Sequence, residues 1–167
     1  MNMSSESHKD QKQKFVARKT KVTVTASPGS GNELVAWSYS AKFEDGGGSN
    51  DKKTSTMKFD KGSGAHDVTF VLVDDSGFGL AFEQEPTDAL WAAAGTACPT
   101  GAGNGGGEIL FEKTPVGSKL TITNQNQAAG DVAYALRFSG ERRANPAKPG
   151  SFVPPYVYDP IMSNGGR

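Results

Sequence analysis

The chain has very few residues of the kinds that build covalent cross-links and metal centres. It contains one cysteine, Cys98, and two histidines among 167 residues. A single thiol cannot close a disulfide within the chain, and a structural zinc site needs about four closely spaced Cys or His ligands. We therefore expect no disulfide framework, no metal site and no other cofactor.

An excess of charge and a long apolar run are also missing. Lys+Arg and Asp+Glu are both 18, so the formal net charge is zero. Proteins that bind nucleic acid through phosphate contacts usually carry a basic excess, so no nucleic-acid partner is expected. No stretch approaches the roughly 18 apolar residues of a membrane helix, and the first residues lack the apolar segment of a secretory signal. The sequence thus predicts a cytoplasmic protein without a membrane partner.

The distribution of apolar residues divides the chain into a tail and one domain. Residues 1–18 are mostly polar and basic, which is typical of a disordered N-terminal tail. Residues 19–167 have the length of a single domain that buries a core of its own. The 21 glycines gather in clusters such as Gly101–Gly107, between apolar segments, and this placement indicates loops.

Short segments with alternating apolar and polar residues dominate this domain and predict β-strands. They cover residues 21–25, 34–40, 54–59, 66–73, 78–82, 108–111, 119–124, 131–138 and 156–158. The only helical pattern is residues 86–94, with Thr87 as a candidate cap. Because no strand–helix–strand alternation is present, the sequence predicts an all-β, antiparallel, immunoglobulin-like sandwich of about eight strands with one short helix. A barrel is the alternative.

No ordinary enzyme site is visible. A nucleophilic residue needs a base beside it, and Cys98 and His66 could meet only through the fold, because no local motif joins them. Cys98 precedes Pro99 in a glycine-rich loop, a setting typical of an unreactive, half-buried cysteine. The sequence therefore assigns no reaction to this thiol.

The Asp159–Pro160 bond has chemistry of its own. An aspartate carboxylate can attack its own peptide carbonyl through a five-membered ring and form an anhydride, while the tertiary amide nitrogen of proline leaves once it is protonated. At neutral pH the fold must assist, through a donor to the carbonyl oxygen, an acid for the nitrogen or a raised aspartate pKa. A lysine amine could capture the anhydride as an isopeptide bond.

The segment from Tyr158 to Gly166 reads YDPIMSNGG and follows a series of strands. In this it resembles the Asp-Pro/Glu-Pro family of small bacterial β-sandwich proteins, whose characterised type is a self-cleaving, aspartic-peptidase-like protein. The resemblance implies that Asp159 and Pro160 are the scissile pair and that residues 160–167 stay in the sandwich as a strand. It also implies that Asp159 can become linked to a lysine.

The linking lysine is left open by the sequence. Lys148 is one candidate, and it lies in the proline-rich stretch Arg142–Pro155 that precedes the last strand. Lys113 and Lys119 lie on or near neighbouring predicted strands.

Two classes of function follow from these observations. The first is a single self-cleavage at Asp159–Pro160. The alternative is a non-catalytic structural or binding module whose last strand stays intact at a sheet edge. Such a module would bind a protein partner or form a homo-oligomer through that strand or the glycine-rich loops. Pro154, Pro155 and Pro160 would then protect the edge from uncontrolled pairing.

Overall fold

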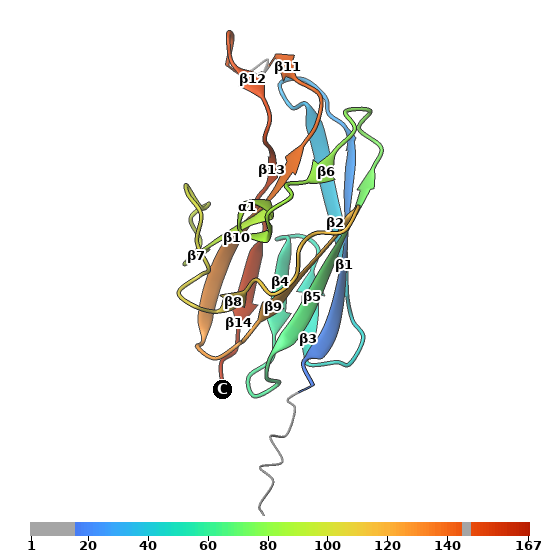
Figure 1. Ribbon diagram of the computed structural model, residues 1–167. Helices are drawn as coiled ribbons and strands as arrows, with labels where there is room; N and C mark the ends of the chain where they lie inside the picture. The colour runs from blue at the N-terminus through green and yellow to red at the C-terminus, as the bar shows by residue number, and fades with distance from the viewer. Residues whose placement is uncertain (1–15, 145–147) are drawn as a thin grey trace, which may run out of the picture.

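A computed structural model describes residues 16–144 and 148–167 of the chain (Figure 1). The tail predicted for residues 1–18 lies outside the described residues except for its last three positions. Arg18 already begins the first strand, β1, so the domain starts one residue earlier than the sequence predicted.

Strands account for almost all regular structure in the described ranges, which confirms the all-β prediction. They are β1 (Arg18–Pro28), β2 (Val35–Phe43), β3 (Gly48–Asp51), β4 (Thr56–Phe59), β5 (His66–Asp74), β6 (Ala81–Phe82), β7 (Leu90–Ala94), β8 (Ile109–Leu110), β9 (Lys119–Asn124), β10 (Gly130–Ser139), β11 (Arg143–Ala144), β12 (Phe152–Val153), β13 (Tyr156–Tyr158) and β14 (Ile161–Asn164). The helix α1 spans Pro86–Ala89.

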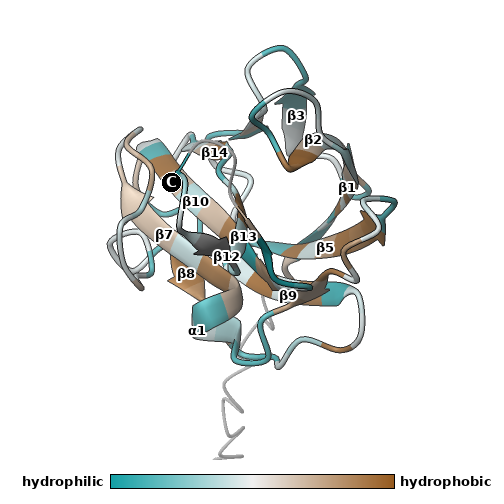
Figure 2. Ribbon diagram, turned by 90° about the horizontal axis from the view of Figure 1, so that it is seen from above, coloured by the Kyte–Doolittle hydropathy of each residue, from teal (hydrophilic) through white to brown (hydrophobic). Residues whose placement is uncertain are grey.

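Two sheets face one another across a common core (Figures 1 and 2). One has the order β2-β1-β5-β9-β8, and the other has the order β13-β10-β14-β4-β3, with β6 and β7 also paired to β10. The proline-rich stretch forms the separate β11–β12 hairpin, as expected for a segment that cannot be a central strand. In Figure 1 this hairpin extends beyond the two sheets.

The core forms where the alternating strands turn their apolar residues inward. Fully buried side chains from one sheet include Val22, Phe70 and Ile122, and those from the other include Leu136 and Phe138. Each such side chain contributes about 1.5 to 3 kcal/mol when it is removed from water. The strand register therefore follows from the pattern of apolar residues, since a shift by one position would expose this whole set.

The predicted antiparallel arrangement is wrong for two strand pairs. β1 pairs with β5 in parallel, and β14 pairs with β4 in parallel. Parallel neighbours need a long connection, and here the connections pass through the other strands of the sandwich. Both sheets are therefore mixed.

The predicted helix over residues 86–94 ends early. Leu90 has an extended backbone, with φ −137° and ψ 123°, and Leu90–Ala94 form β7, which pairs antiparallel with β10. Glu85 takes the N-cap position in place of Thr87 and makes no side-chain cap hydrogen bond. A long partner strand satisfies the backbone of these residues and buries Leu90 and Ala92, and this outweighs their helical propensity.

The tail strand β14 does not lie at a sheet edge, so the alternative is wrong for these residues, whereas β13, predicted as the strand 156–158, stands at the end of the sheet order. β14 pairs with β10 on one side and with β4 on the other. The strand is therefore enclosed, and its backbone is not open to a new partner.

Candidate functional site

The Asp159–Pro160 bond lies between two strands that continue one another. β13 and β14 both pair antiparallel with β10, and the pairs Leu136 with Tyr158 and Ala133 with Ile161 belong to one register. Tyr134 therefore lies opposite Pro160, and its backbone N–H donates to the Pro160 carbonyl at 3.1 Å. Proline has no N–H to return, so the hydrogen-bond ladder lacks one bond here.

The two residues of the bond face opposite sides of the sheet. Pro160 is buried, like the inward-facing Tyr156 and Met162 on either side of it. Asp159 is exposed on the outer face. The carboxylate is thus in water, while the proline ring is packed into the sandwich.

The loop after β7 brings Cys98 to this carboxylate. Pro99 is buried, and so is the outward-facing Ala135 opposite Asp159, because the loop lies against this face of the sheet. Burial, then a hydrogen bond with Asp159 and the negative charge of that residue, raises the pKa of Cys98 to about 11. The thiol is therefore protonated at neutral pH, and it donates to the Pro99 carbonyl at 3.9 Å.

Trp91 and Arg137 complete this outer face. Trp91 is paired with Ala135 in the register of β7 and β10. The Arg137 guanidinium lies 3.8 Å from the centre of the Trp91 ring and donates to the Asp88 carbonyl at 3.1 Å. This cation–π contact fixes the arginine beside the indole, so the guanidinium is oriented toward β7.

Ser55 contacts both sides of the bond from the β3–β4 turn. Its carbonyl accepts the Ile161 N–H at 3.3 Å, and its hydroxyl lies 3.5 Å from the Tyr158 hydroxyl. Ser55 has φ +52°, a left-handed conformation that is unfavourable for residues other than glycine. Strained residues of this kind gather at functional sites, and here the strained residue adjoins the candidate scissile bond.

Three buried or half-buried phenols lie on the inner side. Burial, followed by mutual electrostatic effects, raises the pKa of Tyr134 and Tyr39 well above the usual range, and burial raises the pKa of Tyr158. Tyr39 donates to the Asn50 side chain and to the Asp51 carbonyl. The inner side of the bond is therefore lined by neutral O–H groups.

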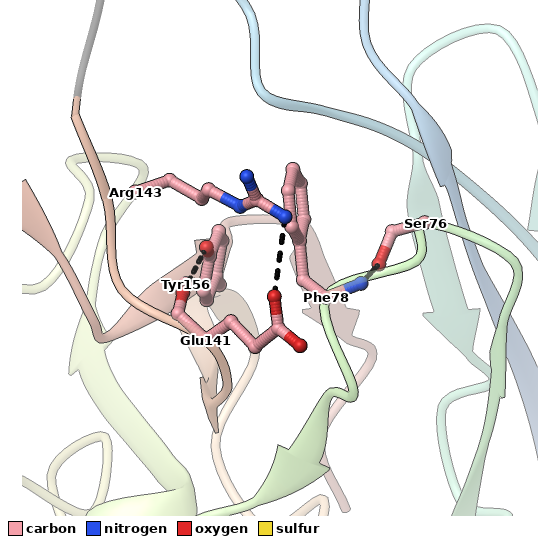
Figure 3. Close-up of polar contacts among 5 residues, drawn as sticks. All are labelled: Ser76, Phe78, Glu141, Arg143 and Tyr156. Carbon is pink, nitrogen blue, oxygen red and sulfur yellow. Dashed lines mark hydrogen bonds and ion pairs between the residues drawn. The ribbon is translucent and has the colours of Figure 1, made fainter.

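An aromatic cluster anchors the strand before the bond (Figure 3). The Tyr156 ring stacks on Phe78 with centres 5.4 Å apart, and its hydroxyl donates to the Glu141 carbonyl at 2.6 Å. The Arg143 guanidinium carbon lies 5.3 Å from the centre of the Phe78 ring, and the guanidinium forms an ion pair with the Glu141 carboxylate at 3.2 Å. The Phe78 N–H donates to Ser76 Oγ at 3.2 Å. These contacts hold the start of β13.

The candidate lysines are not gathered at this site. Lys148 lies in the turn of the β11–β12 hairpin, where its carbonyl accepts the Ser151 N–H at 3.1 Å, and β12 and β13 separate that turn from Asp159 (Figure 1). Lys113 and Lys119 line a groove on the opposite sheet. The β3–β4 turn, in contrast, carries the exposed Lys52 and Lys53 just before Ser55.

His66 does not meet Cys98. Its ring nitrogens lie 3.3 Å from Thr20 Oγ1 and 2.9 Å from Ser63 Oγ, in a buried position at the start of β5. No group of three or more His, Cys, Asp or Glu residues within 16–144 and 148–167 is arranged to hold a metal ion. Over the same residues, no helix is long and apolar enough to cross a membrane.

The sequence predicts Asp159, Pro160 and Lys148 as site residues and assigns no role to Cys98, Ser55 or Tyr134. The contact between Cys98 and Asp159 depends on how a glycine-rich loop folds back, for which the sequence holds no periodic signal. Tyr134 lies opposite Pro160 through the pairing of β10 with β13 and β14, and the sequence alone does not fix a pairing between such distant segments.

No protein-family model matches the chain, and no curated protein matches it. Among solved structures, the inclusion body protein PixA from Burkholderia cenocepacia is 8% identical in sequence. The superposition covers 88% of this chain and 95% of that chain, with a TM-score of 0.38. At this score the likeness carries no argument about function.

Proposed function

We propose that the protein cleaves its own chain once, at Asp159–Pro160, and keeps the peptide that begins at Pro160 as strand β14. The proposal is supported chiefly by the position of the bond within one continuous register against β10. Both flanking segments are held by hydrogen bonds, so the bond can break without the strand leaving the sheet. The exposed carboxylate has access to water for the second half of the reaction.

The reaction has two balanced steps. The Asp159 carboxylate attacks its own carbonyl carbon and closes a five-membered anhydride, while the bond to the Pro160 nitrogen breaks and that nitrogen takes a proton from solvent. Water then opens the anhydride, which leaves two carboxyl groups on Asp159 and a free proline amine. Holding the carboxylate against the carbonyl replaces a chance encounter by a fixed geometry, which is a general source of rate acceleration.

Cys98 acts in this scheme as a positioning residue. A thiol with a pKa of about 11 is ionised in about one molecule in ten thousand at pH 7, so it is a poor nucleophile. As a neutral donor beside Asp159, it instead restricts the rotation of the carboxylate.

A lysine amine takes the place of water if an isopeptide forms. The amine opens the anhydride to an amide and leaves one carboxylate on Asp159. Lys52 and Lys53 belong to the turn that contacts both sides of the bond through Ser55, and we propose them ahead of Lys148. The product would be lighter by one water than the hydrolysed large fragment.

Intact mass under denaturing conditions tests the proposal. We expect a large fragment that ends at Asp159 and a small one that begins at Pro160, accumulating on incubation from acid to neutral pH. Asp159→Ala should stay whole, whereas Asp75→Ala, which removes an exposed carboxylate elsewhere, should cleave like the wild type. A full-length mass for the wild type after long incubation would show that the proposal is wrong.

The alternative function is a non-catalytic module that binds or assembles through its glycine-rich loops, and it predicts only the full-length mass. An immunoglobulin-like topology and a cytoplasmic location remain part of the proposal. Fractionation of cells that produce the full chain tests the location, since a periplasmic or secreted pool would contradict it.

A further inference from the structure

The last segment of the chain fills a slot in its sheet. Within the described residues β10 and β4 are not paired with each other, and β14 joins them, antiparallel to β10 and parallel to β4. Without Ile161–Asn164, two strands would therefore face one another across a gap of one strand, each with its backbone groups set for an extended peptide.

The slot binds the side chain of Asn164 through hydrogen bonds. The Asn164 amide accepts from Asn124 Nδ2 at 2.7 Å, and it donates to Asn124 Oδ1 at 3.0 Å and to Glu108 Oε2 at 3.2 Å. All three residues are buried. Glu108 also accepts the backbone N–H groups of Gln127 and Ala128 at 2.9 and 3.2 Å, so its carboxylate is held in place. A carboxylate or an apolar side chain in place of the Asn164 amide would leave these partners unmatched.

The slot also requires two glycines. A Cβ atom added to Gly165 would collide with the backbone of Lys61, and one added to Gly166, at φ +84°, would lie 2.8 Å from the Ala129 backbone nitrogen. The Gly165 N–H donates to the Phe59 carbonyl at 2.8 Å, and the Gly166 carbonyl accepts the Gly62 N–H at 2.9 Å. The backbones of Lys61 and Ala129 thus lie too close to Gly165 and Gly166 for any residue larger than glycine at these two positions.

Further contacts continue past the glycines. The Gly166 N–H donates to Asn126 Oδ1 at 3.1 Å, and the Arg167 N–H donates to the Gln127 carbonyl at 3.2 Å. Met162 is completely buried in the core between the sheets. All of these contacts with residues 161–167 are non-covalent. Together they favour a segment with an apolar residue at position 162 and Asn-Gly-Gly at positions 164–166.

We propose that this slot is a peptide-binding site that accepts the Ile161–Arg167 segment of a second copy of the chain. The incoming segment would restore the same backbone and side-chain contacts, as in complementation of a sheet by a donated strand, and would link the copies by strand exchange. The inference does not require the Asp159–Pro160 bond to be cut. The chain's own segment competes at a high effective concentration, so exchange becomes visible once that segment is disabled.

The test uses the full-length double variant Asn164→Asp/Gly165→Ala, whose own segment no longer fits its slot. The probe is a fluorescent synthetic peptide with the sequence Pro160–Arg167, and the matched control peptide carries Asp and Ala at the two changed positions. We expect the probe to bind at least about tenfold more tightly than the control, as measured by fluorescence anisotropy. The wild-type protein, with its slot filled, should bind the probe at least about tenfold more weakly than the variant does.

Equal binding of the two peptides, or binding of neither, would overturn the proposal. Where the variant does not fold alone, it is refolded with each peptide, and its β-sheet circular dichroism must return with the probe and not with the control. Recovery with both peptides, or with neither, also contradicts it. An uncut wild-type mass would contradict self-cleavage alone, because both receptor proteins in this test are full length.

Discussion

Asn164 connects the last strand to a buried polar cluster on its neighbours, so the loss of its amide is expected to lower the stability of the protein. Asn164→Ala would leave the buried Asn124 Nδ2 without its acceptor. It would also remove one donor each from Asn124 Oδ1 and Glu108 Oε2, which keep the backbone donors Asn126 and Gln127. We expect a loss of about 1 to 3 kcal/mol in the free energy of unfolding, which is the cost of one orphaned buried group. Urea denaturation followed by circular dichroism measures this loss.

Ser163→Ala is the matched control, because Ser163 is the half-buried neighbour of Asn164 on the outer face. It should change the stability by less than about 0.5 kcal/mol. Equal losses for the two variants would mean that the buried amide has no special role.

Cys98 is exposed and yet should react slowly. With a pKa of about 11, the thiol at pH 8 should be alkylated by iodoacetamide about two orders of magnitude more slowly than free cysteine. Asp159→Ala removes a hydrogen bond and a negative charge that raise this pKa, so it should speed alkylation. Mass spectrometry of timed samples gives both rates, and an unchanged rate in the variant would contradict the contact between the two side chains.

At the scale of elements, β7 is a strand whose sequence favours a helix. Exposed Ala94 distinguishes the two states, because threonine is worse than alanine in a helix by about 0.5 kcal/mol and better in a strand by up to about 1 kcal/mol. Ala94→Thr should therefore raise the free energy of unfolding, measured by urea denaturation. A decrease would favour the helix over residues 86–94.

The strands that sequence reasoning found are those whose pattern is local. Alternation located β1, β5, β9 and β10, because each buries one face on its own. It did not locate β7, whose state depends on the distant β10, or β3, which is a polar segment paired with β4.

The order of strands was not available from the sequence, because it depends on pairings between distant segments. For this reason the sequence does not show that β14 lies between β10 and β4. The sequence likewise predicts only part of the candidate site. Asp159 and Pro160 follow from their chemistry, but Ser55 and Cys98 reach the bond through loops.

At the scale of the whole molecule, buried His66 connects several parts of one end of the sandwich. It contacts Thr20 of β1 and Ser63, and Ser63 accepts a hydrogen bond from Asn126, which in turn bonds to Gly166. Burial, followed by the charge of Arg18, lowers the pKa of His66 below 6.5. The unfolded chain therefore takes up this proton at a higher pH than the folded protein does.

The sign of the pH effect follows from this difference. The stabilisation is complete above pH 6.5 and is lost as the pH falls from 6.5 through the lower folded pKa, because protonation then favours the unfolded chain. We expect the urea midpoint of the wild type to decrease between pH 7.5 and pH 5. His66→Gln should start from a lower midpoint and show a smaller decrease. An equal decrease in both proteins would assign the effect to other groups.

The parallel pairing of β14 with β4 also sets an order of events during synthesis. β4 ends at Phe59 and its partner begins at Ile161, so the ribosome must add about one hundred residues before that side of β4 can be paired. At about 5 to 20 residues per second, this takes about 5 to 20 seconds. Throughout this interval the nascent chain presents an unpaired strand to chaperones and to neighbouring chains on the same messenger RNA, and slower translation prolongs the exposure.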